Sequence, residues 1–493
     1  MDRSDGSARA LACALVAVVA IGAPVEGHGP ARGAVPRPPF SLPLPGHALD
    51  RPPSTATCRR LFRLACYGPD QVRRAYGLPA LLARGLDGRG RTIAVIDPYG
   101  SPTIEQDLSR FDRSLSLPDP PWIRVIAPSG LPPFDDADPG LVAWAEETSL
   151  DVEWAHVMAP GAALLVVAVP LSDADGLQGF SDIERAEEWV IRHDLADVIV
   201  ESFGEAETAL PTPAAMPSLR EGLELARARR VTVVAAAGDT GSTQTLPDGS
   251  CCYRHPVVSW PASDPLVTSV GGTRLQLDDA GVREAPDAVW NDPGSVLGGD
   301  PRATAGAGGG GLSRLFPRPA FQDGVAGTVG DHRGVPDVSL SAALDGSVVV
   351  YWSFAGGWTE PGYHLLGGTS EAAPLFAGLV AIADQLAGTR LGWLNGRLYT
   401  LAARGPGSGI VDVTVGDNHQ SFPDAEGRWV TVPGFRARPG YDLASGLGTV
   451  DAARLCLALA RRPGRMEAGE AAAGAPRPPH SEAMASSSER FRV

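Results

Sequence analysis

The stretch GGTSEAAP at residues 367–374 contains the side chain whose chemistry raises the first question about this sequence. Two glycines ahead of a hydroxyl residue and a run of small residues are typical of a turn from a strand into a helix, which would present Ser370 at the helix start. A serine hydroxyl is a weak nucleophile until a neighbouring base takes its proton. The base that Ser370 can reach therefore decides what chemistry is open to the protein.

Histidine is the first base to consider. None of the nine histidines lies in the HGTH setting that a subtilisin-like enzyme would use. His156 lies in VEWAHVMAPGA, where we interpret it as a helical residue of the core or the surface. A histidine-dependent enzyme working near neutral pH is therefore disfavoured.

Carboxylates are the alternative base. Glu147 and Asp151, in the stretch EETSLDVEWAHVMAPGA at 146–162, are four residues apart and would share one face of a helix. Two like charges there are costly in a dry cleft unless they share a proton. On this stretch alone an acidic first helical turn, favoured by the helix dipole, is the better explanation of the pattern.

A third acidic residue, Asp239, lies between glycines in AAAGDTGS at 235–242. Taken alone, such an aspartate is typical of a turn. It follows a buried apolar run, however, and would stand at the carboxyl edge of a sheet, where the Ser370 turn should also open.

Short apolar runs alternate with amphipathic stretches along the chain. The runs predict buried strands at 92–97, 163–169, 197–202, 231–238 and 347–352, and the stretches predict helices at 181–193 and 218–229. This alternation predicts an α/β fold with a doubly wound, mainly parallel sheet flanked by helices. Asp97, Ser202 and Asp239 would then gather at the carboxyl ends of the strands.

Taken together, the motifs resemble those of the sedolisins, or serine-carboxyl peptidases, which have a subtilisin-like fold. The resemblance covers about 66–460 and rests on these motifs in the family's order: TIAVIDPYG, ETSLDVEWAHVMAPGA, SFGE, AAAGDTGS, VVSWPASDPLVTSVGGT, VWND, GGGGLS, RGVPDVSLSA and GGTSEAAPLFAGLVA. It implies a secreted endopeptidase acting on proteins or peptides.

The resemblance also implies residue roles. Ser370 would be the nucleophile, Glu147 its general base, Asp151 the residue that orients Glu147, and Asp239 part of the oxyanion hole. Asp97 would support the Glu147–Asp151 pair. The substrate-binding segment would be Ser202, Phe203 and Gly204, with Phe203 where the family has an aromatic residue close to the bound peptide backbone.

These roles imply a pH range for activity. Glu147 must be ionised while Asp239 is still protonated, so that it can donate a hydrogen bond to a developing oxyanion. From the ordinary carboxyl pKa values we expect activity centred at about pH 3 to 5.

Two aspartates further along the chain, Asp412 and Asp442, lie in glycine-rich loops and alone would read as ordinary turns. The resemblance implies one structural Ca²⁺ ion, which prefers hard oxygen ligands. Its ligands would be the carboxylates of Asp412 and Asp442 and the main-chain carbonyls of Val413, Arg438 and Gly440.

The composition and net charge restrict the kinds of molecule that we expect this chain to bind. The 42 basic and 57 acidic residues give a formal charge of −15, which disfavours nucleic acids and anionic membrane surfaces. All the basic residues are arginine, so no lysine can serve as a nucleophile or base. The glycine run at 306–313 lacks the Lys-Ser/Thr of a phosphate loop, and we expect a flexible loop beside the cleft. We expect a monomer.

The chain ends are predicted from composition. The apolar run at 10–23 indicates a signal peptide over 1–27 and hence secretion, with no later membrane span. A Pro-rich linker at 28–57, a peptidase domain at 58–460 and a disordered Pro/Ala/Ser-rich tail at 461–493 follow.

The linker is too short and Pro-rich to form the large folded propeptide of typical sedolisins, which leaves a catalytically silent secreted peptide-binding protein as the alternative function.

Of the six cysteines, Cys13 lies in the leader and five remain. Cys58 and Cys66 could close a short disulfide loop. We expect the adjacent pair Cys251 and Cys252 not to bond to each other, and at least one thiol to stay free. Zinc is disfavoured because no CxxC or HxxxH spacing is present.

Overall fold

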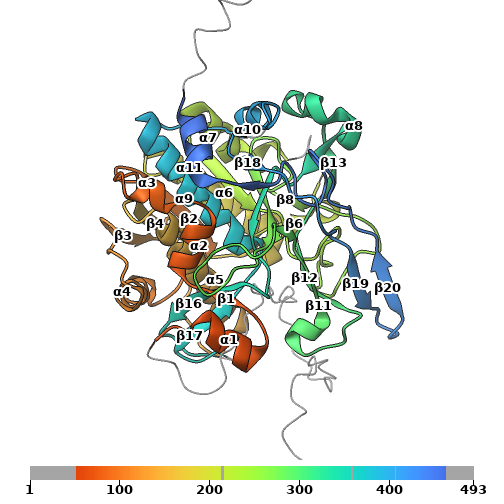
Figure 1. Cartoon of the computed structure of the whole chain (residues 1–493), viewed down its shortest axis with the longest axis horizontal. Coiled ribbons are helices and arrows are strands. Elements are labelled where there is room, and N and C mark those ends of the chain that lie inside the picture. Colours follow the sequence, from red (N-terminus) through yellow and green to blue (C-terminus); the bar gives the residue numbers. More distant parts are fainter. Residues whose placement is uncertain (1–50, 212–215, 357–358, 406, 462–493) are drawn as a thin grey trace, which may run out of the picture. The chain divides into compact units, whose positions relative to one another are not determined.

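The computed structural model describes residues 51–211, 216–356, 359–405 and 407–461 (Figure 1). The expected signal peptide, most of the expected linker and all of the expected tail except Arg461 lie outside these residues. Helix α1 (Thr55–Phe62) begins within the segment expected to be linker, and the Ser54 hydroxyl caps it by accepting the N–H of Thr57 at 3.2 Å.

An eight-stranded sheet organises the fold and confirms the predicted α/β class. Its strand order is β10-β9-β7-β5-β2-β4-β3, with β15 also paired to β9, and every pair is parallel except β9 with β10. The strands are β2 (Thr92–Pro98), β3 (Ile123–Ile126), β4 (Ala163–Val169), β5 (Val198–Glu201), β7 (Thr232–Ala236), β9 (Thr268–Arg274), β10 (Ala288–Val289) and β15 (Val338–Ser341). The chain reverses its direction of travel across the sheet at β2, so the crevice at the carboxyl end of β2 is the expected place for a site.

Helices cover both faces of this sheet. Ile93 and Val95 of β2 face one core cluster, whereas Ala94 and Ile96 face the other. The first cluster is covered by α4 (Ile104–Leu115), α5 (Pro139–Met158), α9 (Thr369–Ala387) and α11 (Ala452–Ala460), and the second by α6 (Leu177–Arg192) and α7 (Glu221–Arg229). The continuous apolar runs of the strands follow from this double burial. The two predicted helices are confirmed as α6 and α7, with shifted ends.

One predicted strand lies outside the main sheet. Residues 347–352 form β16 (Ser347–Trp352), which pairs parallel to β1 (Cys66–Tyr67) and antiparallel to β17 (Gly362–Leu366) in a separate small sheet. The apolar run of β16 predicts that both faces of the strand are buried, but it does not predict which strand lies beside it. Grouping it with the parallel strands was therefore wrong, although its strand character is confirmed.

Short helices and strand pairs complete the described chain. The helices are α2 (Pro69–Ala75), α3 (Pro79–Leu82), α8 (Ala326–Val329) and α10 (Asn395–Ala402). The strand pairs are β6 (Glu205–Ala206) with β8 (Ser259–Trp260), β11 (Asn291–Pro293) with β12 (Thr304–Ala307), β13 (Gly311–Pro317) with β14 (His332–Val335), β18 (Ile410–Val411) with β21 (Thr449–Val450), and β19 (Gln420–Pro423) with β20 (Trp429–Val432).

The cysteines are partly as expected. Cys58 and Cys66 form a disulfide, and Cys456 is a buried free thiol. The expectation that Cys251 and Cys252 stay apart was wrong: they are bonded to each other, with Cα atoms 3.1 Å apart across a cis peptide bond. Within the described residues no group of three or more His, Cys, Asp or Glu side chains is arranged to hold a metal ion.

Candidate active site

Ser370 lies at the start of α9, directly after a strand. Strand β17 ends at Leu366, and Gly368 caps the helix with a φ of 124°, a left-handed conformation open chiefly to glycine. Ser370 is the second helical residue and is 7% exposed. Its backbone N–H belongs to the first turn of the helix, where N–H groups have no partner inside the helix and attract negative charge.

Helix α5 brings the carboxylates to this serine. The Ser370 hydroxyl lies close enough to the carboxylate of Glu147 to favour its ionised form, and Glu147 lies one helical turn from Asp151. The close approach of α9 to α5 depends on Gly378, because a Cβ there would lie 2.5 Å from the Cβ of Met158. The predicted pairing of Ser370 with Glu147 and Asp151 is thus a geometric feature of the fold.

Burial dominates the ionisation of the acidic pair. It raises the pKa values of Glu147 and Asp151 well above their usual range, and the nearby Asp97 carboxyl raises both further. The Ser370 hydroxyl beside Glu147 and the hydrogen bond from Ser202 to Asp151 oppose this rise in pKa by favouring the ionised forms.

Asp97 completes a group of three buried carboxyls. It ends strand β2 and is fully buried, and burial raises its pKa to about 7, against the lowering effect of the Thr148 hydroxyl. Among the described residues, Oε1 of Glu147 and Oδ2 of Asp151 are buried without a hydrogen-bond partner. Three carboxyls in one dry site cannot all be ionised, so they titrate as a unit that retains protons.

Asp239 contacts Thr369, the residue that precedes Ser370. Its Oδ1 accepts the backbone N–H of Thr369 at 2.7 Å and the Thr369 hydroxyl at 2.8 Å. Burial raises the pKa of Asp239, while the two hydrogen bonds from Thr369 oppose that rise. Because both bonds go to Oδ1, Oδ2 is the oxygen left to carry a proton. Sequence reasoning missed Thr369, whose only signal was its position next to Ser370.

The glycine run beside Asp239 is packed rather than flexible. Gly309 donates its N–H to the carbonyl of Gly238 at 2.7 Å, and a Cβ on Gly309 would lie 2.1 Å from the carbonyl oxygen of Ala237. Ala307 donates its N–H to the carbonyl of Asp239 at 3.0 Å. The expectation of a flexible loop was wrong, because the missing side chains serve close backbone packing against the Asp239 turn.

The predicted substrate segment follows β5. The Ser202 hydroxyl donates to Oδ1 of Asp151 at 2.9 Å. Phe203 is 6% exposed, and its ring centroid lies 6.3 Å from that of Phe180 in the α6 core cluster. The N–H of Gly204 donates to Oδ2 of Asp173 at 3.2 Å, and burial raises the pKa of Asp173 to about 6. The segment therefore contacts the acidic group at one end and Asp173 at the other.

His156 is remote from this chemistry, as the sequence indicated. It is fully buried, its Nε2 lies 2.8 Å from the Pro118 carbonyl and 3.3 Å from Oδ1 of Asp112, and burial lowers its pKa to about 4. The imidazole is thus a neutral core group.

Of the predicted calcium ligands, the carboxylates of Asp412 and Asp442 each accept a main-chain N–H from the loop at 438–440. Oδ2 of Asp412 accepts the N–H of Gly440 at 2.9 Å, and Oδ2 of Asp442 accepts the N–H of Arg438 at 2.9 Å. Oδ1 of Asp442 accepts the N–H of Ser445 at 2.8 Å, and burial raises the pKa of Asp442. Carboxylate oxygens are hard donors of the kind that Ca²⁺ prefers, and both carboxylates lie beside the loop at 438–442.

Comparisons with known proteins match this chain to peptidases. The Subtilase family model matches residues 140–396. Kumamolisin from Bacillus sp. (strain MN-32) is 34% identical over 416 residues, covering 80% of this chain and 63% of that protein. Sedolisin from Pseudomonas sp. (strain 101) is 28% identical over 368 residues, covering 74% of this chain and 57% of that protein. The chain therefore spans less than two thirds of the length of either relative.

One solved structure has a fold similar to that of this chain. The complex of Pseudomonas sedolisin, a serine-carboxyl proteinase, with two molecules of pseudo-iodotyrostatin matches with a TM-score of 0.66 and 25% identity, covering 80% of this chain and 98% of that chain.

Proposed function

Because this chain belongs to the sedolisin family of peptidases with the subtilisin-like fold, we propose that it is a serine-carboxyl endopeptidase that hydrolyses peptide bonds in proteins at acidic pH. The observation that carries the proposal is that the Ser370 hydroxyl lies next to the buried Glu147 carboxylate and favours its ionised form. A serine at a helix start gains reactivity from a base within hydrogen-bonding reach.

The reaction uses the groups in a defined order. Glu147 accepts the proton as the Ser370 hydroxyl oxygen attacks the carbonyl carbon of the scissile bond. Protonated Asp239 and the Ser370 N–H donate hydrogen bonds to the oxyanion that forms. Glu147 then gives the proton to the leaving amine, and a water molecule repeats the sequence on the acyl-enzyme. Asp151 orients Glu147, and Asp97 supports the pair from behind.

Activity at acidic pH follows from the roles assigned to Asp239 and Glu147. Asp239 donates only while protonated, so activity falls as the pH rises through its raised pKa. Glu147 accepts only while ionised, so activity falls at low pH as Glu147 becomes protonated. Burial of Asp97, Glu147 and Asp151 raises the lower limit, which places the optimum in the upper part of the range from about pH 3 to 5.

Ser202, Phe203 and Gly204 are the residues to which we assign the substrate backbone, with proteins or peptides as substrates. Asp412 and Asp442, with the carbonyls of Val413, Arg438 and Gly440, would hold one Ca²⁺ that stabilises the loops between them. The ion supplies charge compensation to the two carboxylates and takes no part in the chemical steps.

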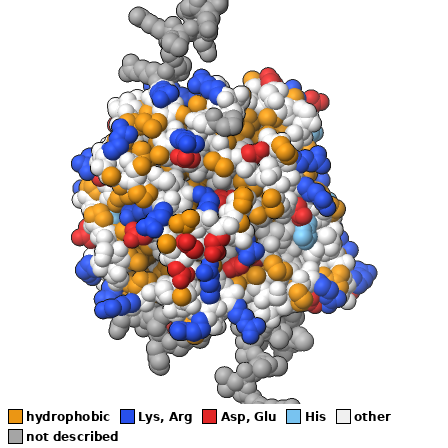
Figure 2. Space-filling view, viewed as in Figure 1, with side chains coloured by type: hydrophobic (Ala, Val, Ile, Leu, Met, Phe, Trp, Pro, Cys, Tyr) orange, Lys and Arg blue, Asp and Glu red, His pale blue; other side chains and the backbone are white. Residues whose placement is uncertain are grey.

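Secretion remains part of the proposal and is supported by the apolar run at 10–23; a monomeric state is proposed beside it. In the described part of the chain no helix is both long and apolar enough to span a bilayer. Acidic and basic side chains are interspersed on the face shown in Figure 2, without a continuous basic area there of the kind that binds nucleic acids.

Mass spectrometry of acid-quenched turnover tests the proposal. An activated ester peptide incubated with the chain at pH 4 is expected to leave an acyl adduct on the peptide containing Ser370, and Ser370→Ala is expected to abolish both the adduct and the hydrolysis of denatured protein. A folded chain that binds peptides but forms no adduct would instead be the catalytically silent binding protein.

A further inference from the structure

A buried carboxyl beside the proposed nucleophile takes no part in the steps above. Glu371 follows Ser370 in the first turn of α9, and its side chain is fully buried. Among the described residues, neither carboxyl oxygen of Glu371 has a hydrogen-bond partner of normal geometry. An ionised carboxylate in such surroundings is very unfavourable, so a glutamate there is kept neutral.

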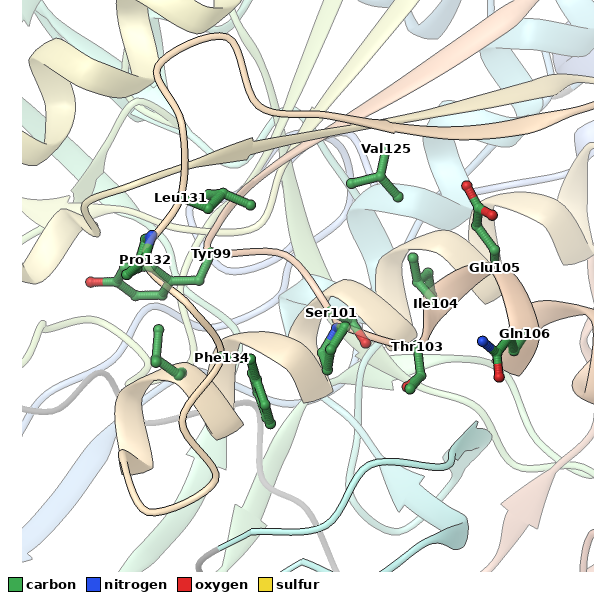
Figure 3. A pocket seen from close by; sticks show the side chains of 12 residues that line it. Tyr99, Ser101, Thr103, Ile104, Glu105, Gln106, Val125, Leu131, Pro132 and Phe134 are labelled. Atoms are coloured by element: carbon green, nitrogen blue, oxygen red, sulfur yellow. The ribbon is translucent and has the colours of Figure 1, made fainter.

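Glu371 is not exposed to water through the hollow beside the carboxyl end of β2. That hollow encloses about 370 Å³, and Tyr99, Leu131 and Phe134 lie around it in Figure 3. Its walls come from the chain between Tyr99 and Leu141, and no residue of α9 lines it. Burial therefore acts on the Glu371 carboxyl in full and raises its pKa well above the usual range.

The end of strand β15 supplies the polar neighbour of Glu371. The hydroxyl of Ser341, the last residue of β15, lies beside the Glu371 carboxyl and favours its ionised form, which opposes the larger effect of burial on the pKa. This hydroxyl oxygen is also buried, with no hydrogen-bond partner of normal geometry among the described residues. A protonated carboxyl and a hydroxyl each offer one donor and one acceptor, so a small rotation lets Glu371 and Ser341 satisfy each other without a buried charge.

Tyr76, at the end of α2, faces the same part of β15. Its hydroxyl oxygen accepts the N–H of Ser341 at 2.8 Å. The Arg283 guanidinium lies 5.5 Å from the centre of the Tyr76 ring and donates to Oδ1 of Asp287 at 2.7 Å. Burial raises the pKa of Tyr76, and the carboxyls of Asp287 and Glu371 raise it further, whereas Arg283 lowers it. Because Arg283 is paired with Asp287, it does not neutralise a charge on Glu371.

The same strand end holds the turn that carries Ser370. The N–H of Gly368 donates to the carbonyl of Ala342 at 2.7 Å, and Ala342 directly follows Ser341. The end of β15 therefore contacts the chain just before Ser370, through Ala342, and just after it, through Ser341 and Glu371. A change in either contact would shift the hydroxyl and the N–H of Ser370.

A negative charge on Glu371 would also oppose the reaction. It would lie one residue along the chain from the Ser370 N–H, which is assigned to the oxyanion. The titratable groups that α5 and the turn after β7 present here, Glu147 and Asp239, are themselves acids and would not neutralise that charge. Like charges in a dry site repel strongly, so the neutral form of Glu371 is the one compatible with the oxyanion.

We propose that Glu371 is a positioning residue for the reaction: in its neutral form it joins the first turn of α9 to Ser341 at the end of β15, and so keeps the Ser370 hydroxyl and N–H in place. The inference rests on the proposed peptidase function and adds to it a residue that touches no substrate. Its effect should therefore appear in the chemical step and not in substrate binding.

Two variants of Glu371 test this role in steady-state assays at pH 4. Glu371→Ala removes the contact and should lower kcat by about 10- to 100-fold, as a small misplacement of a reacting group does, with KM within about threefold of its original value. Glu371→Gln keeps a donor and an acceptor without a charge, so it should recover most of the kcat that Glu371→Ala loses. Glu221→Ala, which removes an exposed acid from the first turn of α7, is the control and should change neither constant.

Infrared spectroscopy of the folded chain at pH 6 tests the neutral carboxyl without requiring turnover. An ordinary glutamate, with a pKa of about 4.3, is ionised at this pH. The difference spectrum between the unaltered chain and Glu371→Gln should contain the C=O band of one protonated carboxyl, and Ser341→Ala should shift that band because its hydroxyl partner is lost. A carboxylate band in its place, or a protonated band that Ser341→Ala leaves unchanged, would overturn the inference.

The two measurements separate this inference from the proposed function. If the unaltered chain hydrolyses peptides but Glu371→Gln is as slow as Glu371→Ala, or Glu371→Ala is as fast as the unaltered chain, the positioning role fails and the peptidase stands. If the protonated band is present and responds to Ser341→Ala but the unaltered chain cuts nothing from pH 2 to 9, the contact between Glu371 and Ser341 stands and the proposed peptidase function fails.

Discussion

The Ser202 hydroxyl donates a hydrogen bond of 2.9 Å to Oδ1 of Asp151, so the end of strand β5 supports the carboxylate behind the proposed base. The residue assigned to the substrate segment is thereby also a positioning residue for the acidic pair. A movement of this strand end on substrate binding would therefore shift the Asp151 carboxylate, and through it the position of Glu147.

Ser202→Ala is the first prediction from this contact. Its hydrogen bond lowers the pKa of Asp151, so the variant should raise that pKa; a protonated Asp151 no longer repels the Glu147 carboxylate, and the low-pH limit of activity should move downward. Loss of one hydrogen bond to a charged group costs about 1.5–3 kcal/mol, and we expect kcat to fall by roughly 10- to 100-fold. Stopped assays of kcat against pH measure both effects, and an unchanged low-pH limit would argue against the positioning role.

Asp239→Asn separates protonation from hydrogen-bond donation. An asparagine amide donates at any pH and can keep its oxygen on the Thr369 N–H, so the high-pH limit of activity should move upward by at least one pH unit or disappear.

Asp239→Ala provides the matched comparison, because it removes the donor altogether. It should lower kcat by about 10²- to 10³-fold at every pH, as loss of one oxyanion donor does elsewhere. If Asp239→Asn kept the high-pH limit of the unaltered chain, Asp239 would not be the group that sets that limit.

Some of this site was predictable from the sequence and some was not. The four-residue spacing of Glu147 and Asp151 placed them on one helix face, and the glycines before Ser370 indicated its turn, because both patterns are local. The roles of Ser202 and Thr369 were not readable, since each depends on a contact with a residue far away in the sequence. Asp239 was recognised through the family motif, because an aspartate between glycines is locally only a turn.

The fold was likewise predictable from the sequence only in part. Burial of β2 on both faces follows from its unbroken apolar run, and the sheet class follows from the alternation of strands and helices. The run at 347–352 is equally apolar yet pairs with β1 and β17, because hydrophobicity does not encode the choice of partner strand. The adjacent Cys251 and Cys252 likewise required a backbone geometry that no spacing rule predicts.

Stability should depend on pH in a way set by a second acidic group under α6. Glu184, Glu187 and Glu201 are buried together, and Oε2 of Glu184 accepts the N–H of Gly222 at 3.1 Å. Burial raises their pKa values, that of Glu201 to about 8, and their mutual repulsion raises those of Glu184 and Glu187 further.

The sign of this dependence follows from linkage. The folded chain holds protons that the unfolded chain releases above its ordinary glutamate pKa of about 4.3, so the stabilisation is complete below that pH. It is lost as the pH rises through the folded pKa values toward about 8. Thermal unfolding should therefore show a Tm that falls between pH 4 and pH 8.

Glu187→Gln tests the origin of that fall. The amide keeps the shape without a charge, so the free energy of unfolding should lose up to about 1.4 kcal/mol less per pH unit than in the unaltered chain. Glu105→Gln, at an exposed site on α4, is the control and should leave the slope unchanged. A Tm that rises from pH 4 to pH 8 would contradict this account.

Calcium should stabilise the chain through Asp412 and Asp442. Removing the ion with a chelator at pH 6 should lower Tm by several degrees, because a ligand at 100 times its Kd stabilises by about 2.7 kcal/mol. Asp442→Asn should have a low Tm already and show no response to added Ca²⁺. A chelator effect that persists unchanged in Asp442→Asn would place the ion elsewhere.

The measurement closest to the central claim is kcat/KM on one peptide from pH 2 to 9 for the unaltered chain, Glu147→Gln and Ser370→Ala. The proposed mechanism predicts a bell-shaped profile confined to acidic pH, and a loss of roughly 10³-fold or more in both variants at every pH. A profile with its maximum near pH 8, or a Glu147→Gln chain that retains its activity, would show that a carboxylate does not activate Ser370.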